Sequence, residues 1–231
     1  MNAGLLVIIL LLGLAFLGFP IYIALGIGTL AALNMAGMPA LVLPQKLFAG
    51  MNSSSLLAIP FFILAGNIMS RSITVKLIDI ANAIIGWIRG SVAVVTVLAS
   101  ALFGAISGSG VATASAIGGI TIPAMQREGY PSEFSTAIAS ISSILGPIIP
   151  PSITLIVYAS ITNVSVSQLF MGSVIPGILL AGSLIVYALV YGKRKNLPAH
   201  EKQTPKQIGH AFKEGIWALL MPIIILGGIF G

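Results

Sequence analysis

The chain has 231 residues, of which 57% are hydrophobic and only 7% are charged. This composition is far more apolar than that of soluble domains, so we predict an all-α integral membrane protein. The net charge of +6 does not indicate nucleic acid, because most lysines and arginines lie in short gaps between apolar runs, where they orient membrane helices. The absence of cysteine excludes disulfides and thiolate metal sites.

The first apolar segment, residues 4–33, is uncharged and too long for a signal-peptide core, so it is expected to remain in the membrane. A single helix of this length would measure about 45 Å, against a hydrocarbon core of about 30 Å. One steeply tilted helix and two pieces broken at Gly18-Phe19-Pro20 both fit, and the side of the N-terminus stays open. A second span is expected at about 55–70, ending at Arg71.

Residues 71–89 combine apolar positions at helical spacing with polar positions between them. The apolar positions are Ile73, Leu77, Ile80, Ile84 and Trp87. This pattern predicts an amphipathic helix lying in the membrane interface. The alternative is an ordinary span that carries three or four charges, which is much costlier in hydrocarbon.

Between Arg89 and Arg127 there is no charged residue, and "ISGSG" at 106–110 divides this stretch into two legs. Each leg has about 16 residues and would be roughly 24 Å long, too short to cross the hydrocarbon core. Both outer ends are basic, which favours keeping them on the cytoplasmic side. The sequence therefore predicts a re-entrant helical hairpin with its tip near mid-membrane.

The next uncharged stretch, 134–192, is interrupted by "GPIIPPS" at 146–152 and by the polar "TNVSVSQ" at 162–168. We predict a broken span, an outer loop and a transmembrane helix at 167–192. A basic cytoplasmic linker should follow at 193–213. A last apolar segment should begin near Gly215, and because it stops without closing polar residues, we expect a truncated or split polypeptide.

The two breaks place backbone oxygens where hydrocarbon offers no partner. Pro147, Pro150 and Pro151 have no N–H, so the carbonyls of Ser143, Gly146 and Pro147 need other partners. A sodium ion suits carbonyl and hydroxyl oxygens. The sodium-binding candidates are Ser107, Gly108, Ser109, Ser143, Gly146, Pro147 and Pro150.

The second leg begins at the tip with free N–H groups and the positive end of its dipole, which suits an organic carboxylate. The substrate-binding candidates are Ser109, Gly110, Val111, Thr113, Pro151 and Ser152. The alternative is purely structural. Serine and threonine would fill helix kinks, and the glycines, including the pair Gly104 and Gly108, would let helices pack closely.

Neither the hairpin nor the broken span contains an ionisable residue before the basic linker, so a proton relay is not expected and coupling should use a metal cation. An intramembrane hydrolase would need a base near "SGSG", but the histidines, His200 and His210, lie in the polar linker. There is no Walker loop, so this chain should not hydrolyse ATP. We therefore expect no catalytic residues and no cofactor besides sodium as the coupling ion.

Three stretches resemble the large membrane subunit of tripartite ATP-independent periplasmic (TRAP) transporters: "FGAISGSGVATASAIGGITIPAM", "REGYPSEFSTAIASISSILGPIIPPSI" and "YASITNVSVSQLFMGSVIPG". The resemblance implies a multi-pass protein of the bacterial inner membrane, in the ion-transporter superfamily, with inverted repeats and an elevator motion. It also implies sodium-driven uptake of an organic acid such as sialic acid or a C4-dicarboxylate. The implied partners are a small four-helix membrane subunit and a periplasmic solute receptor.

Carried over to this chain, the resemblance makes residues 1–70 scaffold helices, 71–89 an arm and 90–166 the transport-domain hairpin and broken helix. Residues 214–231 would start a second repeat. The chain thus covers about one repeat, so a C-terminal half must supply the rest. A scaffold or assembly subunit that does not transport is the alternative.

Overall fold

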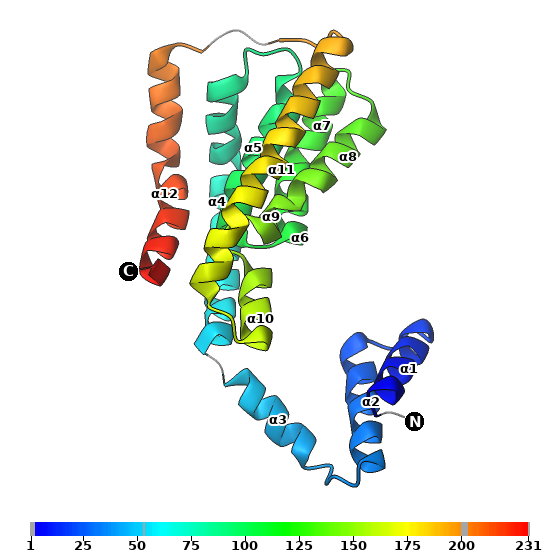
Figure 1. Ribbon diagram of the computed structural model, residues 1–231. Helices are drawn as coiled ribbons and strands as arrows, with labels where there is room; N and C mark the ends of the chain where they lie inside the picture. Colours follow the sequence, from blue (N-terminus) through cyan, green and yellow to red (C-terminus); the bar gives the residue numbers. More distant parts are fainter. Residues whose placement is uncertain (1–2, 53, 200–202, 231) are drawn as a thin grey trace. The chain divides into compact units, whose positions relative to one another are not determined.

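The computed structural model describes residues 3–52, 54–199 and 203–230, and it shows helices joined by short connections, with no strand in these ranges (Figure 1). The predicted all-α class is therefore confirmed. The chain divides into two compact units, Met1–Ser54 and Ser55–Gly231. Some predicted segments include residues outside the described ranges, namely 1–2, 53, 200–202 and 231, and His200 is among these.

The first unit contains α1 (Ala3–Phe16), α2 (Ile21–Met35) and α3 (Val42–Met51). Of the two alternatives for the first apolar segment, the structure has the two shorter helices. Gly18 adopts a left-handed conformation with φ +84°, and Pro20 precedes the first turn of α2. Proline disfavours a helical conformation in the residue before it, which explains why the chain breaks here.

The second unit begins with α4, a single helix over Ser54–Ile85. The chain stays helical through Arg71, so the expected span at about 55–70 and the expected amphipathic helix at 71–89 are joined in one helix, and the end of the span at Arg71 stays a prediction. Arg71 marks a change in polarity, but neither proline nor glycine lies beside it to interrupt the backbone hydrogen bonds. Farther along, Leu77 and Ile80 are buried whereas Ile84 and Trp87 remain about half exposed.

Helix α5 (Ser91–Ser107) lies at the centre of the second unit and is almost entirely buried. It packs against α8 (Ser132–Ser143), α9 (Leu145–Ile148) and α11 (Val166–Arg194). Val92, Ala93, Val94 and Val97 form one cluster with α8 and α11. Ala99, Phe103 and Ile106 form another with Leu77 of α4 and Ala218 of α12.

The expected hairpin is present as two helical legs that meet at residues 108–109. The first leg is α5, and the second consists of α6 (Gly110–Thr113), a π-helical turn over Ala114–Gly118 and α7 (Gly119–Arg127). At 1.5 Å per residue, the 17-residue first leg is about 26 Å long. This length agrees with a hairpin of partial depth, although its position in a bilayer stays a prediction. The π-helical turn was not predicted.

The expected broken helix is also present. Helices α8 and α9 are followed by α10 (Ile153–Thr162), and the axis bends by 45° at the break. The Pro150-Pro151 peptide bond in this break is cis. Because the prolines remove hydrogen-bond donors, the helix cannot continue through them.

Helix α11 covers the transmembrane helix predicted at 167–192, and α12 (Pro205–Phe230) follows the basic linker. The last apolar segment was expected to begin near Gly215, and the helix that carries it, α12, already begins at Pro205, so residues 205–213 of the predicted linker are helical. Within the described residues, Val166–Arg194 and Pro205–Gly228 are long and apolar enough to cross a membrane, and the bent pair would make a third span.

The residues just before α5 contact the residues that follow α11. The Arg89 side chain donates to Asn196 Oδ1, and the Gly90 amide donates to Pro198 O at 3.2 Å. Beside this contact, burial raises the pKa of Tyr130 to about 12, so its phenol stays neutral at physiological pH.

Gly192 has no room for a side chain, because a Cβ there would lie 2.7 Å from Gly90 Cα and 2.8 Å from Arg89 O. We expect Gly192→Val to lower the free energy of unfolding by about 1–3 kcal/mol, since rigid backbone would have to move. Thermal denaturation of the purified full-length subunit measures this. Gly182→Val is the matched control, because a Cβ on Gly182 meets nothing within 4 Å. Equal melting temperatures for the two variants would contradict the close contact.

Candidate functional site

The backbone conformations of Gly108 and Ser109 form the hairpin tip. Helix α5 ends when Gly108 adopts a left-handed conformation with φ +61°, and the Gly108 amide donates to Gly104 O at 2.8 Å. Glycine reaches this conformation without steric cost. The next residue, Ser109, is extended, and its hydroxyl accepts from the Ala112 amide at 3.4 Å. Ser109 therefore caps the second leg, as serine commonly does.

Three oxygens converge just inside the tip, and we call them the oxygen triangle: Ser107 Oγ, Ser109 O and Thr113 Oγ1. Ser107 Oγ lies 3.3 Å from Thr113 Oγ1 and 3.4 Å from Ser109 O. Thr113 Oγ1 donates to Ser109 O at 2.8 Å. Ser107 is 6% exposed and Thr113 is fully buried, so the two hydroxyl groups of the triangle have little contact with solvent.

The tip packs backbone to backbone against the broken helix. A Cβ on Gly146 would lie 2.9 Å from Ser109 O and 3.0 Å from Thr113 Oγ1, and one on Gly104 would lie 2.7 Å from Gly146 Cα. The Ile153 amide also donates to Gly108 O at 3.4 Å. The glycines thus allow the close packing that the structural alternative required, and the same packing brings the two predicted breaks together.

Two carbonyls that the prolines leave without a helical donor have different surroundings. Pro147 O accepts the Ser152 hydroxyl at 2.7 Å, and Ser152 also caps α10 by accepting from the Leu155 amide. Ser143 O faces the second leg, 3.2 Å from where a Cβ on Gly110 would lie. Ser143 O therefore lies beside the start of the second leg.

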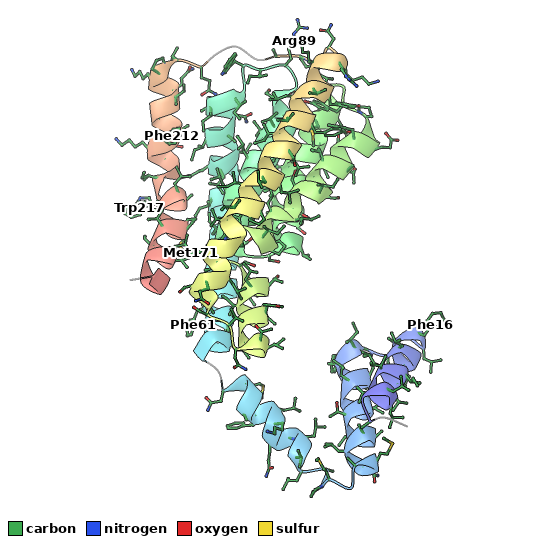
Figure 2. All side chains as sticks on the ribbon, in the orientation of Figure 1. Phe16, Phe61, Arg89, Met171, Phe212 and Trp217 are labelled. Atoms are coloured by element: carbon green, nitrogen blue, oxygen red, sulfur yellow. The ribbon has the colours of Figure 1, made fainter. Side chains whose placement is uncertain are left out.

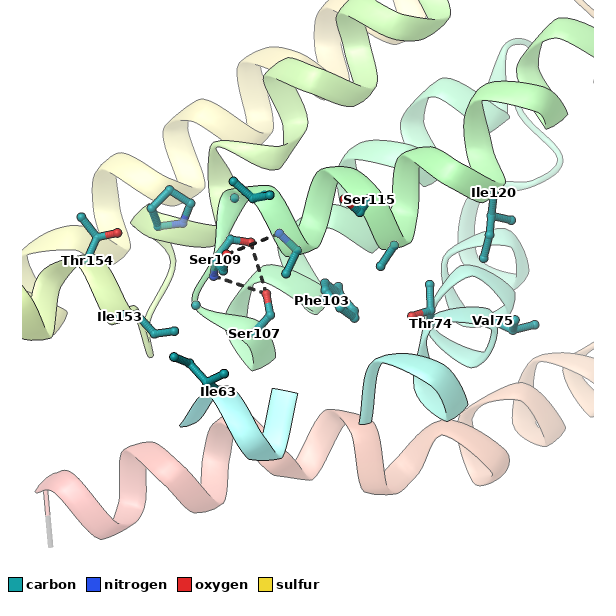
Figure 3. A pocket seen from close by; sticks show the side chains of 16 residues that line it. Ile63, Thr74, Val75, Phe103, Ser107, Ser109, Ser115, Ile120, Ile153 and Thr154 are labelled. Carbon is teal, nitrogen blue, oxygen red and sulfur yellow. Dashed lines mark hydrogen bonds between the residues drawn. The ribbon is translucent and has the colours of Figure 1, made fainter. Parts of the chain in front are cut away.

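An open cavity of about 1010 Å³ lies beside the tip. Figure 3 shows Ser107 and Ser109 in its wall, with Ile63, Thr74 and Val75 contributed by α4. The full lining comprises Ile63, Thr74, Val75, Phe103, Ser107, Gly108, Ser109, Gly110, Val111, Ala112, Ser115, Ala116, Ile120, Pro147, Ile153 and Thr154. None of these residues is charged, so the wall offers hydroxyls, amides and apolar surface.

The predicted residues separate into two groups in the structure. Those that line the cavity are Ser107, Gly108, Ser109, Gly110, Val111 and Pro147. The others, Thr113, Ser143, Gly146, Pro150, Pro151 and Ser152, are buried behind it. Thr113 was predicted on the substrate side, but its hydroxyl points toward Ser107. Ser152 was predicted there too, but its hydroxyl satisfies Pro147 and the first turn of α10.

Sequence reasoning missed the contribution of α4 and of the second leg beyond the tip. Thr74 and Val75 lie in the segment that was interpreted as an interfacial arm, and Ser115 lies in the π-helical turn. A π-turn shifts the register of the residues that follow it and is frequent at functional sites. Nothing in the one-dimensional pattern indicated this turn. His210 does not line the cavity, so no base accompanies the serines there among the described residues.

Comparisons with known proteins show which family the chain belongs to. The chain matches the family described as "Tripartite ATP-independent periplasmic transporter, DctM component" over residues 7–231. It is 42% identical over 229 residues to the C4-dicarboxylate TRAP transporter large permease protein DctM of Vibrio cholerae, covering 98% of this chain and 51% of that protein.

Two further relatives have other substrates in their names. The 2,3-diketo-L-gulonate TRAP transporter large permease protein YiaN of Escherichia coli is 36% identical over 222 residues, 94% of this chain and 52% of that protein. The sialic acid TRAP transporter permease protein SiaT of Haemophilus influenzae is 36% identical over 217 residues, 93% of this chain and 35% of that protein. The chain thus spans about half the length, or less, of these curated relatives.

The apolar helices, the two-legged hairpin and the helix broken opposite its tip define an all-helical membrane protein with an uncharged site between two chain breaks. The match over nearly the whole chain makes the assignment specific: the chain belongs to the DctM component family of tripartite ATP-independent periplasmic transporters. The predicted resemblance is confirmed. This is a family of transporters, and the chain is accordingly not an enzyme.

Proposed function

We propose that this chain forms half of the large membrane subunit of a transporter that couples sodium entry to the uptake of an organic acid. The observation that carries the proposal is the oxygen triangle, packed against the broken helix and open to an uncharged cavity. The relatives are named for C4-dicarboxylates, 2,3-diketo-L-gulonate and sialic acid, all organic acids.

Sodium would bind at the oxygen triangle, with Ser143 O as a further ligand. Ser107 and Thr113 can rotate their hydroxyl hydrogens away and turn lone pairs toward a cation. Ser109 O already lies within reach of both hydroxyls. A cation held by neutral oxygens suits a buried site, since none of these ligands needs to be deprotonated. Gly108, Gly146, Pro147 and Pro150 would contribute by shaping the two breaks.

The organic acid would bind in the adjacent cavity, against Ser109, Gly110 and Val111. The sodium ion would place positive charge beside it, and the second leg would present the positive end of its helix dipole. None of the described residues that line the cavity is charged, and we propose that the other half of the subunit supplies a charged partner for the carboxylate. This arrangement makes substrate binding depend on sodium.

The whole transporter would include the C-terminal half of the subunit, a small membrane subunit and a periplasmic solute receptor. It would reside in the bacterial inner membrane. The hairpin and the broken helix would move together as part of an elevator-type transport domain, because their backbones are in direct contact and cannot slide apart easily.

The test is uptake by the complete complex in proteoliposomes with an inward sodium gradient or an equal potassium gradient. We expect uptake of the organic acid only with sodium, and we expect Ser107→Ala combined with Ser109→Ala to lower the apparent sodium affinity at least about tenfold. Sodium-independent uptake would contradict the coupling. A non-transporting scaffold is the second candidate, because the same glycines serve close packing, and it predicts that the double variant leaves uptake and sodium dependence unchanged.

A further inference from the structure

A second, polar groove of about 690 Å³ lies between α4 and α12, and it shares no lining residue with the cavity at the hairpin tip. Its lining comprises Lys76, Asp79, Asn82, Gln203, Lys206, Gln207, Gly209, His210, Ala211, Lys213 and Glu214. The proposed transport cycle uses none of these side chains, so their concentration here needs another explanation.

Next to the groove along the two helices, α12 and α4 are in close contact. A Cβ on Gly215 would lie 2.3 Å from Ile80 Cδ1, and Ala218 is buried in the same cluster as Leu77. Glycine and alanine bring α12 close to α4 at this level. The longer polar side chains of α4 and of the preceding turns of α12 then line the two sides of the groove.

The groove carries more positive than negative charge. Lys76, Lys206 and Lys213 face Asp79 and Glu214, and Glu214 Oε1 lies 3.3 Å from His210 Nε2. Within the described residues, none of the three lysines has an ion-pair partner. Among the described lining residues, three ammonium groups therefore face two carboxylates, and this excess of positive charge favours an anionic ligand.

The groove lies at the level where α12 changes from polar to apolar. Its first three turns carry Lys206, His210 and Lys213, whereas Trp217 is 74% exposed and begins the apolar part. Figure 2 shows Phe212 and Trp217 on α12, with Phe212 nearer than Trp217 to the end of the second unit at which Arg89 lies. Exposed tryptophan and lysine next to an apolar helix are typical of the membrane–water interface.

We propose that this groove binds the phosphodiester headgroup of an anionic phospholipid, with the acyl chains lying along the exposed apolar side of α12. The lysines match the charge of the phosphate, and basic pockets between membrane helices on the cytoplasmic side commonly hold such headgroups. Ile216, Ile223 and Ile224 are exposed on the same helix and offer apolar surface to the chains.

The experiment uses the complete complex reconstituted in vesicles that contain brominated phosphatidylglycerol or brominated phosphatidylcholine. Bromine quenches tryptophan, and the Trp217 signal is the difference between each variant and the same variant carrying Trp217→Phe. We expect a preference for phosphatidylglycerol, and we expect Lys206→Gln combined with Lys213→Gln to reduce that preference at least about fivefold. Quenching by phosphatidylcholine should stay the same, which shows that the helix remains in the bilayer.

The matched control is Lys193→Gln combined with Lys195→Gln, which removes two charges at the same end of the chain but outside the groove. This control variant should keep the preference for phosphatidylglycerol. An unchanged preference in the groove variant, or an equal loss in both variants, would overturn the proposal. Displacement of phosphatidylglycerol by millimolar inorganic phosphate would also overturn it, because the groove would then bind a soluble anion.

Discussion

Replacing Gly146 with valine is expected to reduce uptake by the complete complex strongly and to lower its melting temperature. A Cβ at this position would lie 2.9 Å from Ser109 O and 3.0 Å from Thr113 Oγ1, and one of these atoms is backbone. The broken helix would have to move away from the hairpin tip, which costs about 1–3 kcal/mol and separates Ser143 O from the oxygen triangle. We expect uptake to fall at least about tenfold, since small displacements at such a site are costly.

The control for this change is Gly172→Val on α11, where a Cβ would meet nothing within 4 Å. It introduces the same side chain into a helix of the same unit and should leave uptake and melting close to wild type. If Gly146→Val also behaves like wild type, the close packing of the tip against the broken helix is contradicted. If it melts normally but does not transport, the packing matters for the cycle more than for the fold.

Replacing Thr113 with valine is expected to raise the sodium concentration needed for half-maximal uptake about tenfold. The substitution keeps the β-branched shape but removes one hydroxyl of the oxygen triangle, and a buried ligand to a charge contributes about 1.5–3 kcal/mol. Uptake at saturating sodium should change much less, because the cavity wall does not include Thr113. The measurement is the sodium dependence of the initial uptake rate in proteoliposomes.

Thr121→Val gives a matched control in the same leg of the hairpin. Thr121 is also buried, at 2% exposure, and its hydroxyl donates to Ile117 O at 2.9 Å within its own helix. Loss of this bond should leave the sodium dependence unchanged. A similar shift in both variants would assign the effect to packing, and no shift in Thr113→Val would remove Thr113 from the sodium site.

The sequence determined the elements that carry the site. "SGSG" at 107–110 and "GPIIPPS" at 146–152 had to interrupt helices, because glycine permits a left-handed turn and proline cannot donate a helical hydrogen bond. Both interruptions are where they were predicted, and the all-helical class follows from the apolar composition. Polarity was a weaker guide, since the charges at Lys193 and Arg194 coincide with a helix end, whereas those at Arg71 and at 206–214 lie within α4 and α12.

Only the tertiary structure decided which residues meet. The sequence could not show that Thr113 faces Ser107, because the conformation of Ser109 sets where the second leg begins and which way its side chains point. Nor could it assign Thr74, Val75 and Ser115 to the cavity wall, since this depends on the packing of α4 and on a π-helical turn. The local sequence determines where the backbone hydrogen bonds of a helix are interrupted. Close packing between segments distant in the sequence decides which atoms lie together at these interruptions.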